Sequence, residues 1–470
     1  SLETLTIPFV GETLGESEKA TAKETMFGWI FGYNNGDIKD NASYSIVNSL
    51  QNVHITNDKN ISPYAFYNLP NVDYVSLADT IETIGEYAFA NNNTLSVVRF
   101  ADGYRMTTVS NNLFQNATAL QGFNLGGNVS DTKDTTAIVR RLPDCVTTIG
   151  AYAFDGCSDV HFIDFAVSNN VTTIGKYAFS RTSSMVSFSF DETCQIKTLS
   201  EGTFKDAIKL QMTTLPDSFT RVEKYAFENC SSITEFTLSN NVEYIGEAVF
   251  RGATSLETLT IPFVGEHLGA SVEATIKERM FGWIFGYKEG AITDNSSYSI
   301  VDSLRNVHIT DDINIAKYAF YNLAKVDYIA LGNTIESIGA YAFAENKSLS
   351  VVRFEEGYKM TAVSDHLFQN ATALVGFNLG GNVTDAKEVS SIVRRLPDSV
   401  QTIGAYAFDG CNNVGFTDFA VSSNVTAIGE YAFSNTSNMV TFTFDDVCQI
   451  ATLSEGTFKN ATKLQMTTLP

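Results

Sequence analysis

The sequence predicts a solenoid, in which the chain winds into stacked coils that share one parallel β-sheet. The first observation is a short phrase, Ile84-Gly-Glu-Tyr-Ala-Phe89, that recurs with variations along the whole chain. The second is the spacing of its phenylalanines, which is 23 residues from Phe66 to Phe89 and 25 from Phe89 to Phe114. The third is a trio of apolar residues that follows each phenylalanine. Self-similarity at a short period is typical of repeat folds with one coil per repeat.

The segment after each phrase predicts one strand per coil. Phe89 is followed, at positions six, nine and eleven further on, by Leu95, Val98 and Phe100. Apolar residues two apart, with polar neighbours, are typical of a half-buried strand. We expect successive strands to pair in parallel, with the Ala-Phe pairs filling a shared interior. We expect Gly85 where the chain reverses and a Cβ would be costly.

These two motifs carry a resemblance to a known family. The stretches IGEYAFANNNTLSVVRF (residues 84–100) and IGEAVFRGATSLETLTIP (residues 245–262) resemble the BspA-like, or Treponema-pallidum-type, leucine-rich repeat. The resemblance implies a right-handed leucine-rich-repeat superhelix with its parallel sheet on the concave face. It further implies short turns or 3-10 helices on the convex side and few α-helices. It implies a secreted or cell-surface bacterial protein used for adhesion or recognition, but not which ligand is bound.

The chain contains a large internal duplication. Ser1–Pro8 reappears letter for letter at Ser255–Pro262, which gives an offset of 255 − 1 = 254 residues. We therefore expect one continuous solenoid over residues 1–470, with 1–254 as a first copy and 255–470 as a truncated second copy. Both ends lie inside a repeat, so we expect the full protein to continue in both directions.

Two irregular insertions interrupt each copy. The first lies near residues 9–49 and again near 263–303, where Phe31 stands in the place of Phe89. A large loop on one turn of a solenoid is a common place for binding residues. The alternative is a surface excursion with Trp29 in the core. The charged stretch Glu16–Glu24 fits either a short helix or a loop.

The second insertion lies near residues 126–146 and again near 380–400. Within Ser130–Leu142, the spacing of apolar residues predicts one face of a helix after polar residues suited to a cap. Two adjacent cations, Arg140 and Arg141, repeat in the second copy as Arg394 and Arg395. They are candidates for anion binding, or a solvated or locally paired helix end.

Charge and composition exclude several classes of partner. The formal net charge of −22 argues against nucleic acid, whose binding relies on neutralising phosphates with Lys and Arg. It also argues against an anionic membrane surface, and no segment is apolar enough to insert. Self-repulsion favours a soluble monomer. The six cysteines form no metal or disulfide pattern, so we expect free thiols in small buried slots.

The sequence offers no motif for catalysis, metal binding or a cofactor. No HExxH, Walker loop, Gly-x-Ser-x-Gly or calcium loop is present. Paired carboxylates such as Asp191-Glu192 have nothing to place them in a desolvated cleft, which acid–base chemistry needs. The sequence therefore predicts a protein that is not an enzyme and needs no cofactor.

The outward face of the sheet is the predicted ligand site. Residues eight and ten after each phrase phenylalanine should point away from the core, and exposed aromatic and charged side chains there suggest recognition. The candidates are His54, Tyr74, Arg99, Phe162, Asp164, Glu235, His308, Tyr328 and Arg353. Phe162 and Met212 have an alternative reading as buried residues of shifted coils.

We therefore expect a surface module that binds a host or bacterial protein or glycan through the concave face or its loops. The alternative is a rigid spacer that displays another domain, since duplication lengthens a rod without creating a site.

Overall fold

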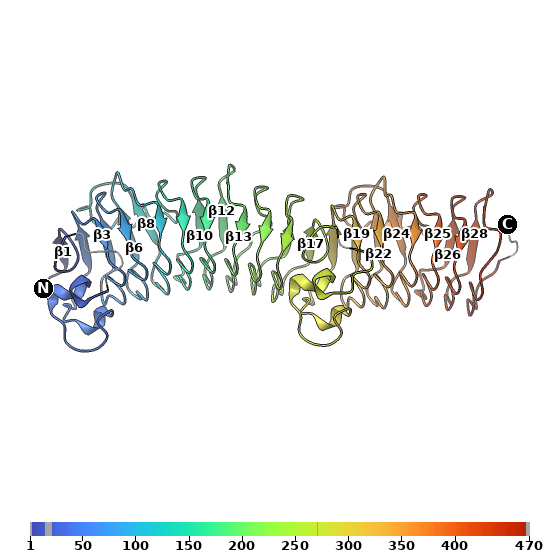
Figure 1. Cartoon of the computed structure of the whole chain (residues 1–470), viewed down its shortest axis with the longest axis horizontal. Coiled ribbons are helices and arrows are strands. Elements are labelled where there is room, and N and C mark those ends of the chain that lie inside the picture. The colour runs from blue at the N-terminus through green and yellow to red at the C-terminus, as the bar shows by residue number, and fades with distance from the viewer. Residues whose placement is uncertain (1, 15–20, 270, 467–470) are drawn as a thin grey trace. The chain divides into compact units, whose positions relative to one another are not determined.

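The computed structural model describes residues 2–14, 21–269 and 271–466. It divides into two compact units, residues 1–212 with 216–233 and residues 213–215 with 234–470. Within each unit, the parallel strands of successive coils lie side by side (Figure 1). In each unit the first of the two predicted insertions projects from the coils (Figure 1). The predicted parallel-strand solenoid is confirmed in both units.

In the first unit, four-residue strands form the main sheet. A five-stranded parallel ladder runs in the order β1-β2-β4-β6-β8, and β10 and β12 form a separate parallel pair. These strands are β1 (Thr4–Ile7), β2 (Asn52–Ile55), β4 (Tyr74–Leu77), β6 (Val97–Phe100), β8 (Gly122–Leu125), β10 (Asp164–Val167) and β12 (Ser187–Phe190).

The second unit repeats this sheet. A six-stranded parallel ladder runs in the order β15-β17-β18-β20-β22-β24, and β26 pairs with β28. The strands are β15 (Glu235–Thr237), β17 (Thr258–Ile261), β18 (Asn306–Ile309), β20 (Tyr328–Leu331), β22 (Val351–Phe354), β24 (Gly376–Leu379), β26 (Asp418–Val421) and β28 (Thr441–Phe444).

Shorter strands of two residues pair in several separate parallel sheets, which we together call the back ladder. In the first unit it comprises β3 (Asn60–Ile61), β5 (Thr83–Ile84), β7 (Thr108–Val109), β9 (Thr148–Ile149), β11 (Thr173–Ile174), β13 (Thr198–Leu199) and β14 (Arg221–Val222). In the second unit it comprises β16 (Tyr244–Ile245), β19 (Asn314–Ile315), β21 (Ser337–Ile338), β23 (Ala362–Val363), β25 (Thr402–Ile403) and β27 (Ala427–Ile428).

The helices of the described residues are all short 3-10 helices, as expected for this class of solenoid. They are η1 (Lys23–Thr25), η2 (Phe27–Phe31), η3 (Asn41–Ser43), η4 (Lys277–Arg279), η5 (Phe281–Phe285), η6 (Asn295–Ser297) and η7 (Val389–Ser391). Most of the stretch Glu16–Glu24 lies outside the described residues, and its end belongs to η1.

The predicted helix over Ser130–Leu142 is wrong. Val139 instead forms an antiparallel bridge with Phe123 of β8, and Arg141 forms a parallel bridge with Ala166 of β10. The backbone of Val139 and Arg141 is thus paired with two different strands, which a helix over these residues would forbid.

The interior is built from the repeated phenylalanines. Phe66, Phe89 and Phe114 stack nearly parallel, with ring centroids 5.0 and 5.5 Å apart, and Phe320 and Phe343 do the same at 5.2 Å in the second unit. A ring such as Phe89 is thus buried between the phenylalanine rings of the preceding and the following coil, which its own coil cannot supply. A single coil could not bury this surface, so its stability comes from the stack.

The phrase has a distinct role at each position. Ile84 belongs to the back ladder, and Ala88 and Phe89 are buried. A Cβ on Gly85 would lie 2.3 Å from the backbone nitrogen of Pro63 in the preceding coil, so glycine is required by close approach of the coils. Tyr87, rather than the glycine, has a left-handed backbone conformation, with φ of 59°. The Tyr87 ring stacks on Tyr64 of the preceding coil.

All six cysteines are free thiols, as predicted. Cys157, Cys230 and Cys411 are fully buried, and burial raises the pKa of each of these thiols far above its ordinary value. Cys157 lies 3.3 Å from the carbonyl oxygen of Phe114, to which its Sγ–H donates. The slot therefore holds a small, protonated, inert side chain.

Candidate functional site

The outward face of the first strands is covered, which changes where a ligand can bind. Residues 126–139 and 380–393, which we call the straps, fold back over the sheet in the first and second unit. Tyr74 and Arg99 are 0% and 7% exposed, and Tyr328 and Arg353 are likewise buried. The predicted exposure of these side chains, and of His54 and His308, is wrong because each strap lies on them.

Polar contacts with the strap backbone hold it in the first unit. The Tyr74 hydroxyl donates to the carbonyl of Asp131 at 3.0 Å. Arg99 donates through Nε to the Tyr74 hydroxyl at 2.5 Å and through its terminal nitrogens to the carbonyls of Gly126 and Thr132, at 2.6 and 3.2 Å. His54 Nδ1 lies 2.7 Å from the carbonyl oxygen of Val129. Tyr74, Arg99 and His54 therefore hold the strap against the sheet.

The second unit repeats the strap with one difference. Arg353 donates to the Tyr328 hydroxyl at 2.6 Å and to the Gly380 carbonyl at 2.6 Å, and Tyr328 donates to the Asp385 carbonyl at 3.0 Å. His308 Nδ1 faces Thr260 Oγ1 at 3.2 Å instead of the strap. Burial, with a smaller contribution from the Arg353 guanidinium, lowers the pKa of His308 to about 4.

The coil that carries Phe162 is wound differently from its neighbours. Its strand β10 begins ten residues after Phe154, whereas β6 begins eight residues after Phe89. The two extra residues bring Phe162 into the core, where it is fully buried, so its predicted exposure is wrong and the alternative reading holds. Met212 is also buried.

Asp164 and Glu235 are exposed on their strands, as predicted. Asp164 pairs with Arg140, whose terminal nitrogen lies 3.0 Å from Asp164 Oδ1, and Arg141 pairs with Asp144 at 2.8 Å. In the second unit Arg394 and Arg395 pair with Asp418 and Asp398. The paired cations are therefore neutralised locally, as one of the two interpretations expected.

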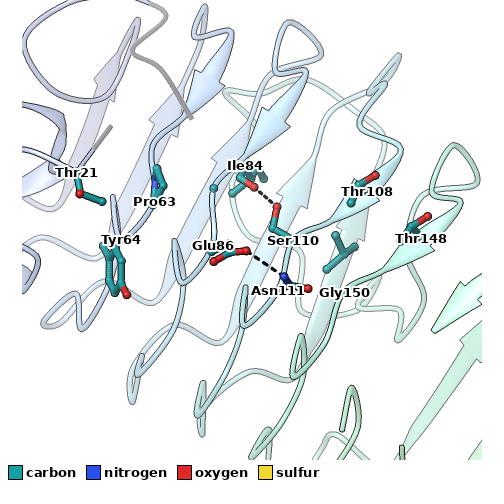
Figure 2. Close-up of a pocket in the computed structure, with 12 residues that line it drawn as sticks. Thr21, Pro63, Tyr64, Ile84, Glu86, Thr108, Ser110, Asn111, Thr148 and Gly150 are labelled. Carbon is teal, nitrogen blue, oxygen red and sulfur yellow. Dashed lines mark hydrogen bonds between the residues drawn. The ribbon is translucent and has the colours of Figure 1, made fainter. Parts of the chain in front are cut away.

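A groove on the flank of the first unit is a further candidate site (Figure 2). It has a volume of about 560 Å³ and crosses the back ladder where β5 and β7 do not pair. Its lining comprises Thr21, Pro63, Tyr64, Ile84, Gly85, Glu86, Thr108, Val109, Ser110, Asn111, Thr148 and Gly150.

The interruption of the back ladder has a visible cause in the sequence. Ser110 stands where the phrase has glycine, and its hydroxyl donates to the carbonyl of Ile84 in the preceding coil. Ser200 repeats this contact with Ile174 at 2.5 Å, where β11 and β13 do not pair. A serine hydroxyl thus takes the place of a backbone bond at both interruptions.

The polar side chains of the groove are held in fixed positions. Asn111 Nδ2 donates to Glu86 Oε1 at 3.0 Å (Figure 2). Asn111 Oδ1 accepts from the backbone N–H of Ala151 at 2.9 Å. The second bond fixes which way the amide points. At the rim, Tyr64 stacks on Tyr87 with centroids 4.9 Å apart, and burial raises the pKa of its hydroxyl.

The second unit has replaced this chemistry. The counterparts of Glu86, Thr108 and Asn111 at the 254-residue offset are Ala340, Ala362 and Asp365, and Lys317 stands in the place of Pro63. There the backbone N–H of Lys317 donates to the carbonyl of Val272 at 2.8 Å, and the Lys317 ammonium pairs with Glu273. Lys317 therefore holds the segment that contains Val272 and Glu273 against the second unit.

Within residues 2–14, 21–269 and 271–466, no cluster of three or more His, Cys, Asp or Glu side chains could hold a metal ion. Over the same described residues, no helix is long and apolar enough to cross a membrane.

With this geometry in place, the comparisons with known proteins identify the family. Five segments match the model of the BspA type leucine rich repeat region (6 copies), namely residues 34–137, 141–168, 147–272, 291–390 and 387–470. The chain belongs to this family. The BspA-type repeats span both units, and the predicted leucine-rich-repeat solenoid is confirmed. Among curated proteins none matches the chain.

Solved structures show distant likeness to the BspA-type repeats of this chain. A leucine-rich repeat protein from Bacteroides ovatus is 20% identical with a TM-score of 0.44, over 83% of this chain and 86% of that chain. A leucine rich cell surface protein from Faecalibacterium prausnitzii is 18% identical with a TM-score of 0.33, over 84% and 87%. The pneumococcal vaccine antigen PcpA is 12% identical with a TM-score of 0.25, over 84% and 73%.

Proposed function

We propose that this chain is a non-catalytic recognition module of a bacterial cell-surface protein, which binds a host or bacterial surface protein or glycan through the flank groove of its first unit. The observation that carries the proposal is the groove itself, with its fixed Glu86–Asn111 pair and its hydroxyl-bearing walls. Membership of the BspA-type repeat family supports the recognition role.

The groove fits binding better than catalysis. Glu86 faces the Asn111 amide, which is neither a proton donor of suitable strength nor a nucleophile. Tyr64 also lines the groove, but burial raises the pKa of its hydroxyl further from neutrality. General acid–base catalysis needs a second group with a suitable pKa within reach. An acceptor beside a fixed donor is instead the arrangement that orients a polar ligand.

The exposed residues of the sheet face remain candidate contacts. Asp164 in the first unit and Glu235 in the second are retained from the predicted set. The others lie under the straps or in the core, so their side chains hold the fold together and are not proposed as direct contacts.

A spacer is the second candidate function. It is favoured by the duplication, because the second copy keeps the repeats and straps of the first while changing Glu86 and Thr108 to alanine. A copy that needs only to stack would tolerate such losses.

The test is binding of the fluorescently labelled chain to bacterial and host cell surfaces. A double variant, Glu86→Ala with Asn111→Ala, removes the pair in the first unit, and Asp365→Ala is the matched control in the second. We expect the double variant to bind about tenfold more weakly or worse, and the control to bind like the unchanged chain. Equal binding by all three chains would rule out the groove, and silence of the unchanged chain on every surface would favour the spacer.

A further inference from the structure

We infer that the exposed face of the first insertion, residues Trp29–Phe31, is a docking surface for one further leucine-rich-repeat segment. That segment has the phrase of Ile245–Phe250, with alanine at the left-handed position. We call this surface the insertion face. It shares no residue with the flank groove, so the inference goes beyond the proposed function and does not rest on it.

The insertion face exposes apolar surface that its counterpart buries. Trp29 and Phe31 are half-buried, and Ile30 is 45% exposed. In the second unit the identical segment Trp283–Phe285 is at most 6% exposed. Both segments belong to the same kind of 3-10 helix, η2 and η5, so their burial differs because of what packs against them.

The covering segment in the second unit is Ile245–Phe250, the phrase of the preceding coil. The Ala248 N–H donates to the carbonyl of Trp283 at 3.0 Å. The Phe250 N–H donates to the carbonyl of Ile284 at 2.9 Å. In return, the Trp283 indole Nε1–H donates to the carbonyl of Ile245 at 2.9 Å. The segment is therefore held by main-chain bonds as well as by apolar contact.

The same groups are unpaired on the insertion face. Within the described residues, no protein group bonds to the indole N–H of Trp29 or to the carbonyl of Ile30. The carbonyl of Trp29 accepts from Gly32 of its own turn, at 3.1 Å, as the carbonyl of Trp283 also does from Gly286. A segment that docks there gains main-chain hydrogen bonds together with apolar burial, which is how added strands bind to their partners.

A glycine beside the face sets the size of the residue that can dock. A Cβ built on Gly286 would lie 2.9 Å from the Cβ of Ala248, whereas a Cβ built on Gly32 would meet no atom within 4 Å. Most phrases have tyrosine at the position of Ala248. In the arrangement of the second unit a tyrosine there would be overpacked against the glycine, so the face fits a phrase with alanine.

The loop next to the insertion packs elsewhere in the second unit. Among the described residues there, the loop that corresponds to residues 15–20 contacts the following coil, where Val272 and Glu273 are held by Lys317. The phrase Ile245–Phe250 is what closes the face of Trp283–Phe285.

A second copy of this chain does not supply the segment. Among the described residues, Ala248 is the one alanine with a left-handed backbone. It is 1% exposed, because it is already stacked on its own insertion. The occupant is therefore a further repeat with this phrase, and not a second copy of residues 1–470.

The first experiment measures binding of a fluorescent peptide of residues 241–254 to the full chain by anisotropy. A matched peptide carries Ala248→Tyr. Two variant chains carry Ile30→Glu, on the insertion face, or Val160→Glu, at a residue that is 71% exposed elsewhere in the first unit. Circular dichroism establishes that each chain folds.

We expect the unchanged peptide to bind the unchanged chain and the Val160→Glu chain equally. The Ala248→Tyr peptide should bind at least about tenfold more weakly, and the Ile30→Glu chain should lose binding by about the same factor. Equal binding by both peptides, or equal binding to the Ile30→Glu chain, would overturn the inference.

The second experiment tethers the segment, so that a free peptide's loss of entropy cannot hide docking. Residues 239–254 are added before Ser1, which reproduces the junction with Ser255, because Ser1–Pro8 and Ser255–Pro262 are identical. Trp283→Phe leaves Trp29 as the only tryptophan of the chain.

We expect the extension to shift Trp29 emission to shorter wavelength and to remove most of its quenching by acrylamide, with no such change for an Ala248→Tyr extension. This result supports the inference even where the free peptide binds too weakly to saturate. A Trp29 that stays fully quenched in the extended chain would overturn it. Self-association of the unextended chain that Ile30→Glu abolishes would assign the face to a second copy and would also overturn it.

Discussion

The first insertion of each copy has the same core sequence, Phe-Gly-Trp-Ile-Phe, but a different degree of burial. In the second unit all five residues, Phe281 to Phe285, are buried. In the first unit only Phe27 and Gly28 are buried, and Ile30 is 45% exposed where Ile284 is 0% exposed. The difference shows that the same local sequence is core or surface according to what stacks on it.

The covering coil explains the difference. In the second unit the N–H groups of Ala248 and Phe250 donate to the carbonyls of Trp283 and Ile284, at 3.0 and 2.9 Å. Trp283 Nε1 donates to the carbonyl of Ile245 at 2.9 Å. Within the described residues of the first unit, no counterpart of residues 245–250 lies against the insertion. Stability in a solenoid is therefore a nearest-neighbour property.

The covering coil is itself adapted to the insertion. Ala248 occupies the left-handed position that is tyrosine in most phrases, with φ of 58°. A Cβ built on Gly286 would lie only 2.9 Å from the Cβ of Ala248, so the two residues are in close approach. A small residue is required on each side of this contact.

The largest expected effect separates the two isoleucines. Ile284→Ala should lower the free energy of unfolding of the second unit by about 3 kcal/mol, because it leaves a cavity in a closed core. Ile30→Ala should cost less than about 1 kcal/mol, because its side chain is half in water already. Hydrogen exchange of the amides of residues 27–31 and 281–285 measures the two units separately. Equal losses in both units would contradict the nearest-neighbour account.

The second expected effect is a pH dependence of the second unit. Because burial lowers the pKa of His308 to about 4 from an ordinary 6.5, the unfolded chain binds a proton that the folded chain excludes. Stability should therefore fall as the pH drops from about 6.5 to about 4, by up to about 3 kcal/mol in total. His308→Gln should remove this contribution, and urea unfolding of both chains at pH 7 and pH 4.5 measures the difference. An unchanged pH profile in the variant would show that other groups cause it.

The third expected effect is smaller and runs against the repeat pattern. Ala248→Tyr restores the usual residue of the phrase, yet it should destabilise the second unit by about 2 kcal/mol through overpacking against Gly286. Asn112→Tyr is the matched control in the first unit, because its counterpart His366 already stacks between Tyr341 and Tyr406, with centroids 4.3 and 4.9 Å away. We expect this control to be neutral or to stabilise by about 0.5 kcal/mol. A neutral Ala248→Tyr in thermal unfolding would refute the contact as the reason for alanine.

The sequence predicted those parts of the fold that depend on contacts between adjacent coils. The phenylalanine spacing and the apolar trio specify coils and strands, because each repeat meets only copies of itself. The straps could not be predicted in this way. Ile138 and Val139 have a helical spacing to Leu142. Nothing local shows that Tyr74 and Arg99 would donate to strap carbonyls more than 25 residues away.

Phe162 shows why a correct period can hide a wrong register. Its coil has two extra residues before the strand, whereas the coil of Phe89 has its two extra residues after the strand. Both coils therefore advance by 25 residues from one phenylalanine to the next, and the spacing alone cannot distinguish them. The groove was equally hidden, because its lining is assembled from several successive coils and the segment Val109–Phe114 departs from the phrase at most of its positions.

The most direct measurement is a cell-binding titration of the chain after its groove side chains are exchanged for those of the second unit. Our account predicts that Glu86→Ala, Thr108→Ala and Asn111→Asp together reduce binding by about tenfold or more while the melting temperature stays unchanged. Undiminished binding by this folded variant would contradict the claim that the first unit's groove is the recognition site.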